Sequence, residues 1–104
     1  MAIELGYTPN KGNLVLSEGA DWVCSLQEKG VTWPEGTTCR LEFPDLDSVG
    51  PYSATVSEET ATAAFVLQET DTRAADIPAG TKFRIYLVKD DDFLWFYGAV
   101  KRYE

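Results

Sequence analysis

Apolar and polar residues alternate with a period of two in several separate segments of this chain, and this pattern constrains the fold more than any other feature. Successive side chains of a β-strand point to opposite faces, so each alternating segment predicts a half-buried strand. Three such segments are residues 21–27, 38–43 and 81–89. Their expected inward-facing residues are Trp22, Cys24 and Leu26 in the first, Cys39, Leu41 and Phe43 in the second, and Phe83, Ile85 and Leu87 in the third.

Further strands are predicted between turn-forming residues. They cover residues 13–17, 52–56 and 62–68, with a possible short strand at 3–7. Residues 81–89 and 93–103, joined by Asp90, Asp91 and Asp92, form the best hairpin. A single helical turn is expected at 70–76. About seven strands joined mostly by short turns predict an all-β, antiparallel, immunoglobulin-like β-sandwich that forms one domain over residues 1–104.

The segment 93–100 is apolar on both faces. Such a strand lies in the middle of a sheet, or its outer face is covered by another subunit. Within it, Gly98 indicates either a β-bulge or a close approach of another backbone.

Charge and composition exclude several classes of function. The chain has no histidine, which excludes Ser-His-Asp and Cys-His catalysis and histidine-ligated zinc. Its net charge of −8 disfavours binding to nucleic acid and to anionic lipid. No stretch is long and apolar enough for a secretory leader or a membrane span. We therefore expect a non-enzymatic protein without cofactor, synthesised in a cytoplasm.

The two cysteines leave two interpretations open. If 21–27 and 38–43 pair as a hairpin, Cys24 lies opposite Cys39 and a cross-strand disulfide is geometrically conceivable. The alternative, which a cytoplasmic setting favours, is two buried thiols. No metal site is expected: Asp90, Asp91 and Asp92 are consecutive, unlike the alternating ligands of a calcium loop, and suit a solvated hairpin tip.

Aromatic residues supply the candidate interface. Trp33 lies in a loop beside Pro34 and is expected to be the most exposed tryptophan, as a loop anchor or a contact with another subunit. Trp95 and Tyr97 belong to the two-faced strand. These four residues, Trp33, Pro34, Trp95 and Tyr97, are the predicted interface.

Two stretches resemble a known family. The first holds GADWV at 19–23 and VTWPEGT at 31–37. The second holds AFVL at 64–67, TDT at 70–72, IPAG at 77–80, FRIY at 83–86 and GAVKR at 98–102. Together they resemble the LtfC-like small β-sandwich proteins of actinobacterial tailed phages, and they are also similar to N-terminal domains of phage baseplate and tail-fibre proteins.

The resemblance covers residues 14–102 and implies a β-sandwich that is a virion component at the head–tail junction, tail or baseplate. It brings no catalytic residues. Because the last predicted strand ends close to Glu104, a stand-alone adaptor or decoration subunit is expected rather than a fibre. The expected partners are other phage structural proteins and further copies of the chain. The alternatives are a module that binds a host protein during infection and a carbohydrate-binding module that uses Trp33 and Trp95.

Overall fold

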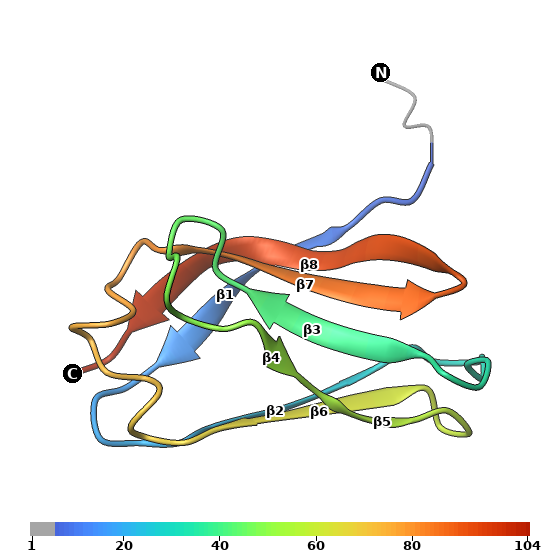
Figure 1. Ribbon diagram of the computed structural model, residues 1–104, viewed down its shortest axis with the longest axis horizontal. Coiled ribbons are helices and arrows are strands. Elements are labelled where there is room, and N and C mark those ends of the chain that lie inside the picture. Colours follow the sequence, from blue (N-terminus) through green and yellow to red (C-terminus); the bar gives the residue numbers. More distant parts are fainter. Residues whose placement is uncertain (1–5) are drawn as a thin grey trace.

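A computed structural model describes residues 6–104 as two stacked β-sheets (Figure 1). The larger sheet, sheet A, contains in spatial order β1 (Asn10–Leu16), β8 (Asp91–Arg102), β7 (Lys82–Lys89), β3 (Thr38–Glu42) and β4 (Tyr52–Ser53). The smaller sheet, sheet B, contains β2 (Trp22–Gln27), β6 (Thr62–Leu67) and β5 (Thr55–Ser57). None of the described residues forms a helix that could cross a membrane.

The predicted all-β sandwich is confirmed, with one exception to its antiparallel pattern. All neighbouring strands are antiparallel except β1 and β8, which run parallel with Leu14 beside Val100. The first strand begins at Asn10, three residues before the predicted start at 13. The short strand suggested at 3–7 lies mostly outside the described residues, and Gly6 and Tyr7 are not in a strand.

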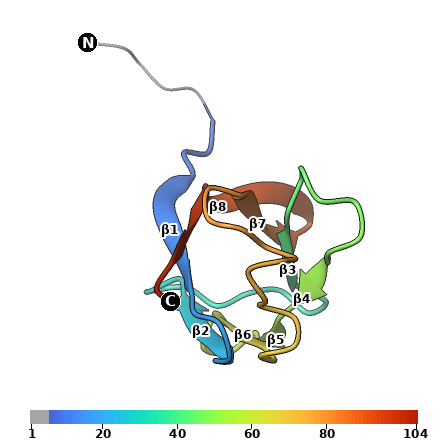
Figure 2. The same ribbon diagram turned by 90° about the vertical axis from the view of Figure 1, so that its left-hand side faces the viewer.

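The segment 52–56, predicted as one strand, is divided between the two sheets. Tyr52 and Ser53 pair with β3 in sheet A, whereas residues 55–57 pair with β6 in sheet B. At the crossing point the amide of Ala54 donates a hydrogen bond to the carbonyl of Cys39 (2.9 Å). The chain therefore closes one side of the sandwich by passing from sheet to sheet, as Figure 2 shows.

No helix forms at 70–76; the amide of Ile77 donates to the carbonyl of Arg73 (2.9 Å), which closes one isolated turn at 73–77. The side chain of Arg102 is only 4% exposed, and its guanidinium donates to the carbonyls of Thr72 (2.8 Å) and Ile77 (2.9 Å). The buried hydroxyl of Thr72 donates in turn to the carbonyl of Ala20 (3.0 Å). Because the segment between β6 and β7 forms isolated turns and no regular helix, its carbonyls are available to accept the hydrogen bonds of Arg102.

The hairpin of β7 and β8 is confirmed, and β8 lies between β1 and β7 as its apolar sequence predicts. The register of the hairpin shifts between Ile85 and Tyr86, which makes Trp95 the extra residue of a bulge. The bulge is therefore not at Gly98. Gly98 instead allows a close backbone approach, since a Cβ there would lie 1.8 Å from the carbonyl oxygen of Gly12.

An internal repeat relates the two halves of the sandwich. The repeated pattern of the second and third strands is Leu26, Gln27, Pro34, Gly36, Thr37 and Arg40, matched by Leu67, Gln68, Pro78, Gly80, Thr81 and Arg84. In both copies the Thr hydroxyl donates to the Pro carbonyl (2.7 Å) and the Gly has a φ of +88°. Only glycine adopts this conformation without strain.

The strand register shows that this repeat is also a pseudo-twofold symmetry. Leu41 pairs with its own counterpart Ile85 in sheet A, and Cys24 pairs with its counterpart Phe65 in sheet B. The same operation superimposes β4 on β8, because Tyr52 lies beside Leu41 as Phe96 lies beside Ile85. The symmetry ends there: β4 leads into β5 of sheet B, whereas β8 continues in sheet A beside β1.

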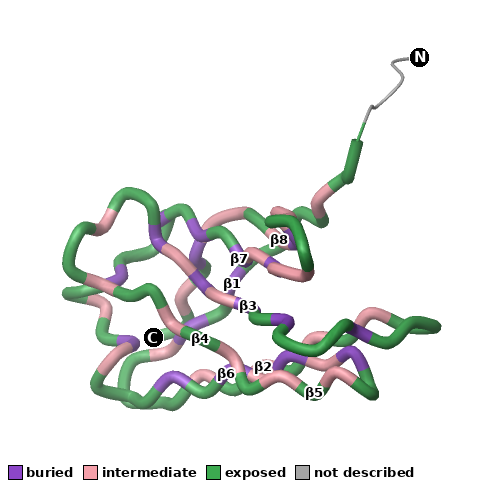
Figure 3. The backbone as a smooth tube through the Cα atoms, turned by 45° about the vertical axis from the view of Figure 1, so that its right-hand side comes forward, coloured by how far each residue is buried: buried purple, intermediate pink, exposed green. Residues whose placement is uncertain are grey.

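The core lies between the sheets, where the buried residues of Figure 3 gather. The residues predicted to face inward in 38–43 and 81–89 are all 0–4% exposed, as are the inward residues of β6: Cys39, Leu41, Phe43, Phe83, Ile85 and Leu87, with Ala63, Phe65 and Leu67. Those of β2 are only half-buried. The hairpin of β2 and β3 on which a disulfide would depend does not form, because β2 pairs with β6 and β3 with β7.

Candidate functional site

The outward-facing side chains of sheet A form a positively charged surface on an acidic protein. We call this surface the cationic face. Its charged members, identified by register and exposure, are Lys11, Arg40, Lys82, Arg84 and Lys101, together with Glu42 and Asp92. Five of the nine Lys and Arg residues thus lie on one sheet face with two of the 17 acids. The remaining four cations and 15 acids belong to the rest of the chain.

Tyr97 lies in the middle of this face. It is paired with Arg84 of β7 on one side and with Lys11 of β1 on the other. Its ring is 37% exposed, so a large amphipathic side chain is available between two cations. Phenol rings and arginines are enriched at the centres of protein interfaces.

Most cations of this face have no carboxylate partner. Arg40 forms an ion pair with Glu42 and lies 4.6 Å from the centre of the Tyr86 ring. Within residues 6–104, Lys82 and Arg84 have no acid within ion-pair distance. Their charges are therefore available to a partner.

The outer face of sheet B carries no charge at all. Its members are Val23, Ser25, Gln27, Thr55, Ser57, Thr62, Ala64 and Val66. Val23 is 72% exposed and lies beside Val66. Apart from Glu42, Asp91 and Asp92, the acids among residues 6–104 lie outside the strands, so the molecule has a cationic face, a neutral face and acidic loops.

The expectation that Trp33 is exposed is wrong. Trp33 and Trp95 are each 4% exposed and pack edge to face with ring centres 5.7 Å apart. The backbone amide of Trp33 donates to the carbonyl of Glu58 (2.9 Å), so its loop is anchored across the sandwich. Of the predicted interface, Pro34 and Tyr97 are exposed, but on different parts of the molecule.

Glu28 fixes the position of Trp33. Its carboxylate accepts hydrogen bonds from the Trp33 indole nitrogen and from the Lys89 ammonium, both at 2.8 Å. These hydrogen bonds, that from Lys89 foremost, hold the pKa of Glu28 below its usual range. These contacts hold the indole ring of Trp33 in the core, and they explain why this tryptophan, although it lies beside a proline in a loop, is not available to a ligand.

Both cysteines are free thiols in the described structure. They belong to strands of different sheets, so the hairpin that would place them opposite each other does not exist. Burial raises the pKa of Cys39 to about 12 and also raises the pKa of Cys24. Neither thiol is activated as a nucleophile.

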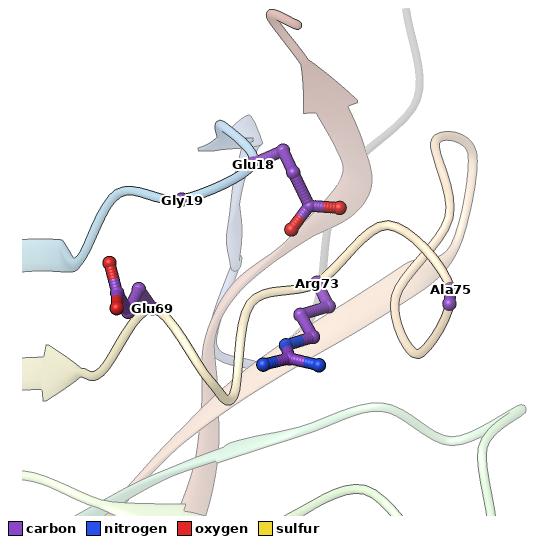
Figure 4. A pocket seen from close by; sticks show the side chains of 5 residues that line it. All are labelled: Glu18, Gly19, Glu69, Arg73 and Ala75. Carbon is purple, nitrogen blue, oxygen red and sulfur yellow. The ribbon is translucent and has the colours of Figure 1, made fainter.

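One depression of the surface has a volume of about 420 Å³ and is lined by Glu18, Gly19, Glu69, Arg73 and Ala75 (Figure 4). The Glu18 carboxylate accepts a hydrogen bond from the amide of Ala74 (3.3 Å), and the Arg73 guanidinium points away from it. These side chains are exposed, and the depression contains neither a nucleophile nor a base paired with one. Among residues 6–104 no cluster of three or more His, Cys, Asp or Glu residues could hold a metal ion.

A second depression, of about 200 Å³, is an apolar groove between the edges of the two sheets. Its walls include Trp22, Cys24 and Leu26 of β2, with Phe83, Ile85 and Phe96 of sheet A. Its lining residues place the groove beside β1 and β2, the strands that end the two sheets. Figure 2 shows these strands on the side of the sandwich away from β4 and β5.

Sequence reasoning selected Tyr97 as a candidate but missed both the cationic face and the groove. A signal for the face was present in the hairpin, where Lys82, Arg84 and Lys101 share the outward phase. Lys11 and Arg40 join them only through strand pairing, which the sequence does not reveal.

Comparison with known proteins supports the sandwich independently. A family model described as LtfC-like, beta-sandwich domain matches residues 8–103. No curated protein matches this chain.

Proposed function

The chain belongs to the LtfC-like β-sandwich domain family, which indicates a phage-related protein, and from this premise we propose that it is a non-enzymatic structural protein of the virion. It works by protein–protein assembly, as a head–tail connector, a tail or baseplate adaptor, or a decoration subunit. The observation that carries the proposal is the cationic face, which presents unpaired cations around the exposed ring of Tyr97. We propose that this face binds an acidic surface of another phage structural protein.

The charge distribution favours a compact acidic protein over a long polyanion. Opposite charges at a protein interface attract the correct partner and reject like-charged surfaces. Fifteen acids outside the cationic face would repel a nucleic acid that extended past its borders. An acidic patch on a folded protein, in contrast, can be as small as the cationic face and so avoid the acids beyond its borders.

The carbohydrate-binding alternative loses its expected residues. It required Trp33 and Trp95 as an exposed platform, but both rings are buried against each other. A host-binding role during infection would use the same cationic face, so the location of the protein separates the two.

The first test is the protein content of purified particles. The proposal expects the protein in virions at a fixed ratio to other structural proteins. Its presence in infected cells together with its absence from particles would contradict a virion role and favour a host partner.

The second test reverses charge on the cationic face. Lys82→Glu/Arg84→Glu should abolish incorporation of the protein in a complementation assay, because both side chains are exposed and unpaired. The control is Lys29→Glu/Arg73→Glu, which changes the net charge equally at exposed residues outside this face. Equal incorporation of both variants would show that the face does not mediate assembly.

A further inference from the structure

The pseudo-twofold symmetry identifies a vacant strand position beside β2. In sheet B, β6 has two neighbours, β2 and β5. The counterpart of β6 is β2, whose only described neighbour is β6. A strand equivalent to β5 would follow β8 and pair with the free edge of β2, but β8 continues in sheet A instead.

The inward side chains of β2 are less buried than those of β6, as expected if a strand is missing beside β2. On β6 the inward residues Ala63, Phe65 and Leu67 are 0–2% exposed. Their counterparts on β2 are Trp22, Cys24 and Leu26, and all three are only half-buried. The equivalent side chains are thus covered in one half of the sandwich and form the wall of the apolar groove in the other.

The edge of β2 also lacks the usual protection against strand addition. Natural edge strands carry charges, prolines or bulges that prevent another strand from pairing with them. The strand Trp22–Gln27 contains neither a charged residue nor a proline, and its register with β6 is regular. Its free backbone groups therefore remain able to pair.

We propose that residues 1–5 of a second copy of this chain add to the free edge of β2 and place Ile3 and Leu5 in the apolar groove. Ile3 and Leu5 alternate with Glu4 in the sequence, so a strand would direct both apolar side chains to one face. At the equivalent position on β6, the short β5 has only three residues and directs a single inward side chain, Val56, beside Ala63. This inference specifies self-association as one contact of the proposed assembly and rests on that function.

The direction of the chain favours donation to another copy. Residues 6–9 precede β1 and lead away from the sandwich (Figure 1). Tyr7 packs on Phe93 at the start of β8, with ring centres 5.2 Å apart. Because the chain before β1 leads outward, the proposed donor is a second copy rather than the same chain.

Cys24 offers a direct test because its thiol lies in the wall of the groove. Ile3→Cys and Leu5→Cys, oxidised with copper phenanthroline at mildly alkaline pH, should form disulfide-linked dimers on a non-reducing gel. Addition of Cys24→Ser should abolish these dimers. The matched control is Glu4→Cys, which lies in the opposite phase of the strand and should yield at least fivefold less dimer.

Three results would overturn the inference: equal dimer yields from all three positions, dimers that persist without Cys24, or an intramolecular Cys24 link in a monomer. In the protein that keeps its two native cysteines, Ile3→Asp/Leu5→Asp should also lower self-association, measured by sedimentation velocity. Glu4→Gln should not lower it. Neither measurement involves Lys82 or Arg84. Failure here therefore leaves the charge-reversal test and the virion test intact.

Discussion

At the scale of single residues, the position of Trp33 shows how one carboxylate changes the meaning of a sequence motif. Trp33 beside Pro34 is typical of an exposed loop, but the Glu28 carboxylate accepts its indole hydrogen bond and that of Lys89. The polar atom of the ring is thereby satisfied, and the ring packs on Trp95 in the core. Burial of this tryptophan depends on a residue five positions earlier and on a strand that follows much later.

Glu28 should make stability depend on pH in the acidic range. Its pKa is lowered by folding, so its contribution is present above its unfolded pKa and is lost as the pH falls through the lower folded value. Glu28→Gln should lower the free energy of unfolding at pH 7 and weaken its decline during acidification, as measured by urea titrations between pH 7 and 3. Glu35→Gln, at an exposed loop position, is the control. Identical pH profiles for Glu28→Gln and the unmodified protein would contradict this role.

At the scale of elements, β8 combines two devices that its apolar sequence did not distinguish. The bulge at Trp95 places two consecutive side chains, Trp95 and Phe96, on the inner face of the sheet. Trp95 is buried in the core, and Phe96 lies beside the buried Ile85. Gly98 then lets β1 approach in parallel, with Gly12 as its partner. The sequence indicated a bulge or a close approach at one residue, whereas the strand has the bulge and the close approach at different residues.

Gly98→Ala should disrupt the pairing of β1 with β8. A Cβ at this position would lie 1.8 Å from the Gly12 carbonyl oxygen, and the φ of +155° disfavours a side chain. We expect a loss of about 1–3 kcal/mol or more in the free energy of unfolding, measured by chemical denaturation. Gly12→Ala is a matched control from the same pair, because nothing lies within 4 Å of its added Cβ. An equal effect of both substitutions would show that the close contact is not the cause.

At the scale of the whole molecule, the pseudo-twofold repeat organises both the fold and the candidate surfaces. It builds two paired strands of each sheet, β3 with β7 and β2 with β6, from the same pattern, including a Pro-x-Gly-Thr turn before β3 and before β7. It also places Arg40 and Arg84 as equivalent residues of the cationic face. Where the symmetry fails, beside β2, the apolar groove remains.

The repeat predicts equal energetic effects at equivalent turns. Thr37→Val and Thr81→Val each remove a hydroxyl that donates to a proline carbonyl at 2.7 Å, and both residues are at least 90% buried. Each substitution should cost about 1 kcal/mol of unfolding free energy by chemical denaturation. Thr38→Val, at the exposed start of β3, should cost less. A large effect at only one of the two turns would mean that the halves are not equivalent.

The sequence by itself determined the local features of this protein. Period-two alternation identified the strands and their inward residues, and the two-faced segment 93–100 identified a central strand, because these properties depend on neighbouring residues alone. The tertiary structure decided which strands pair, and thereby that Cys24 and Cys39 lie in different sheets, that Arg102 binds the carbonyls of residues 72 and 77, and that five cations share one face. Such contacts join residues far apart in the chain, and their selection depends on packing the whole core, which no local pattern encodes.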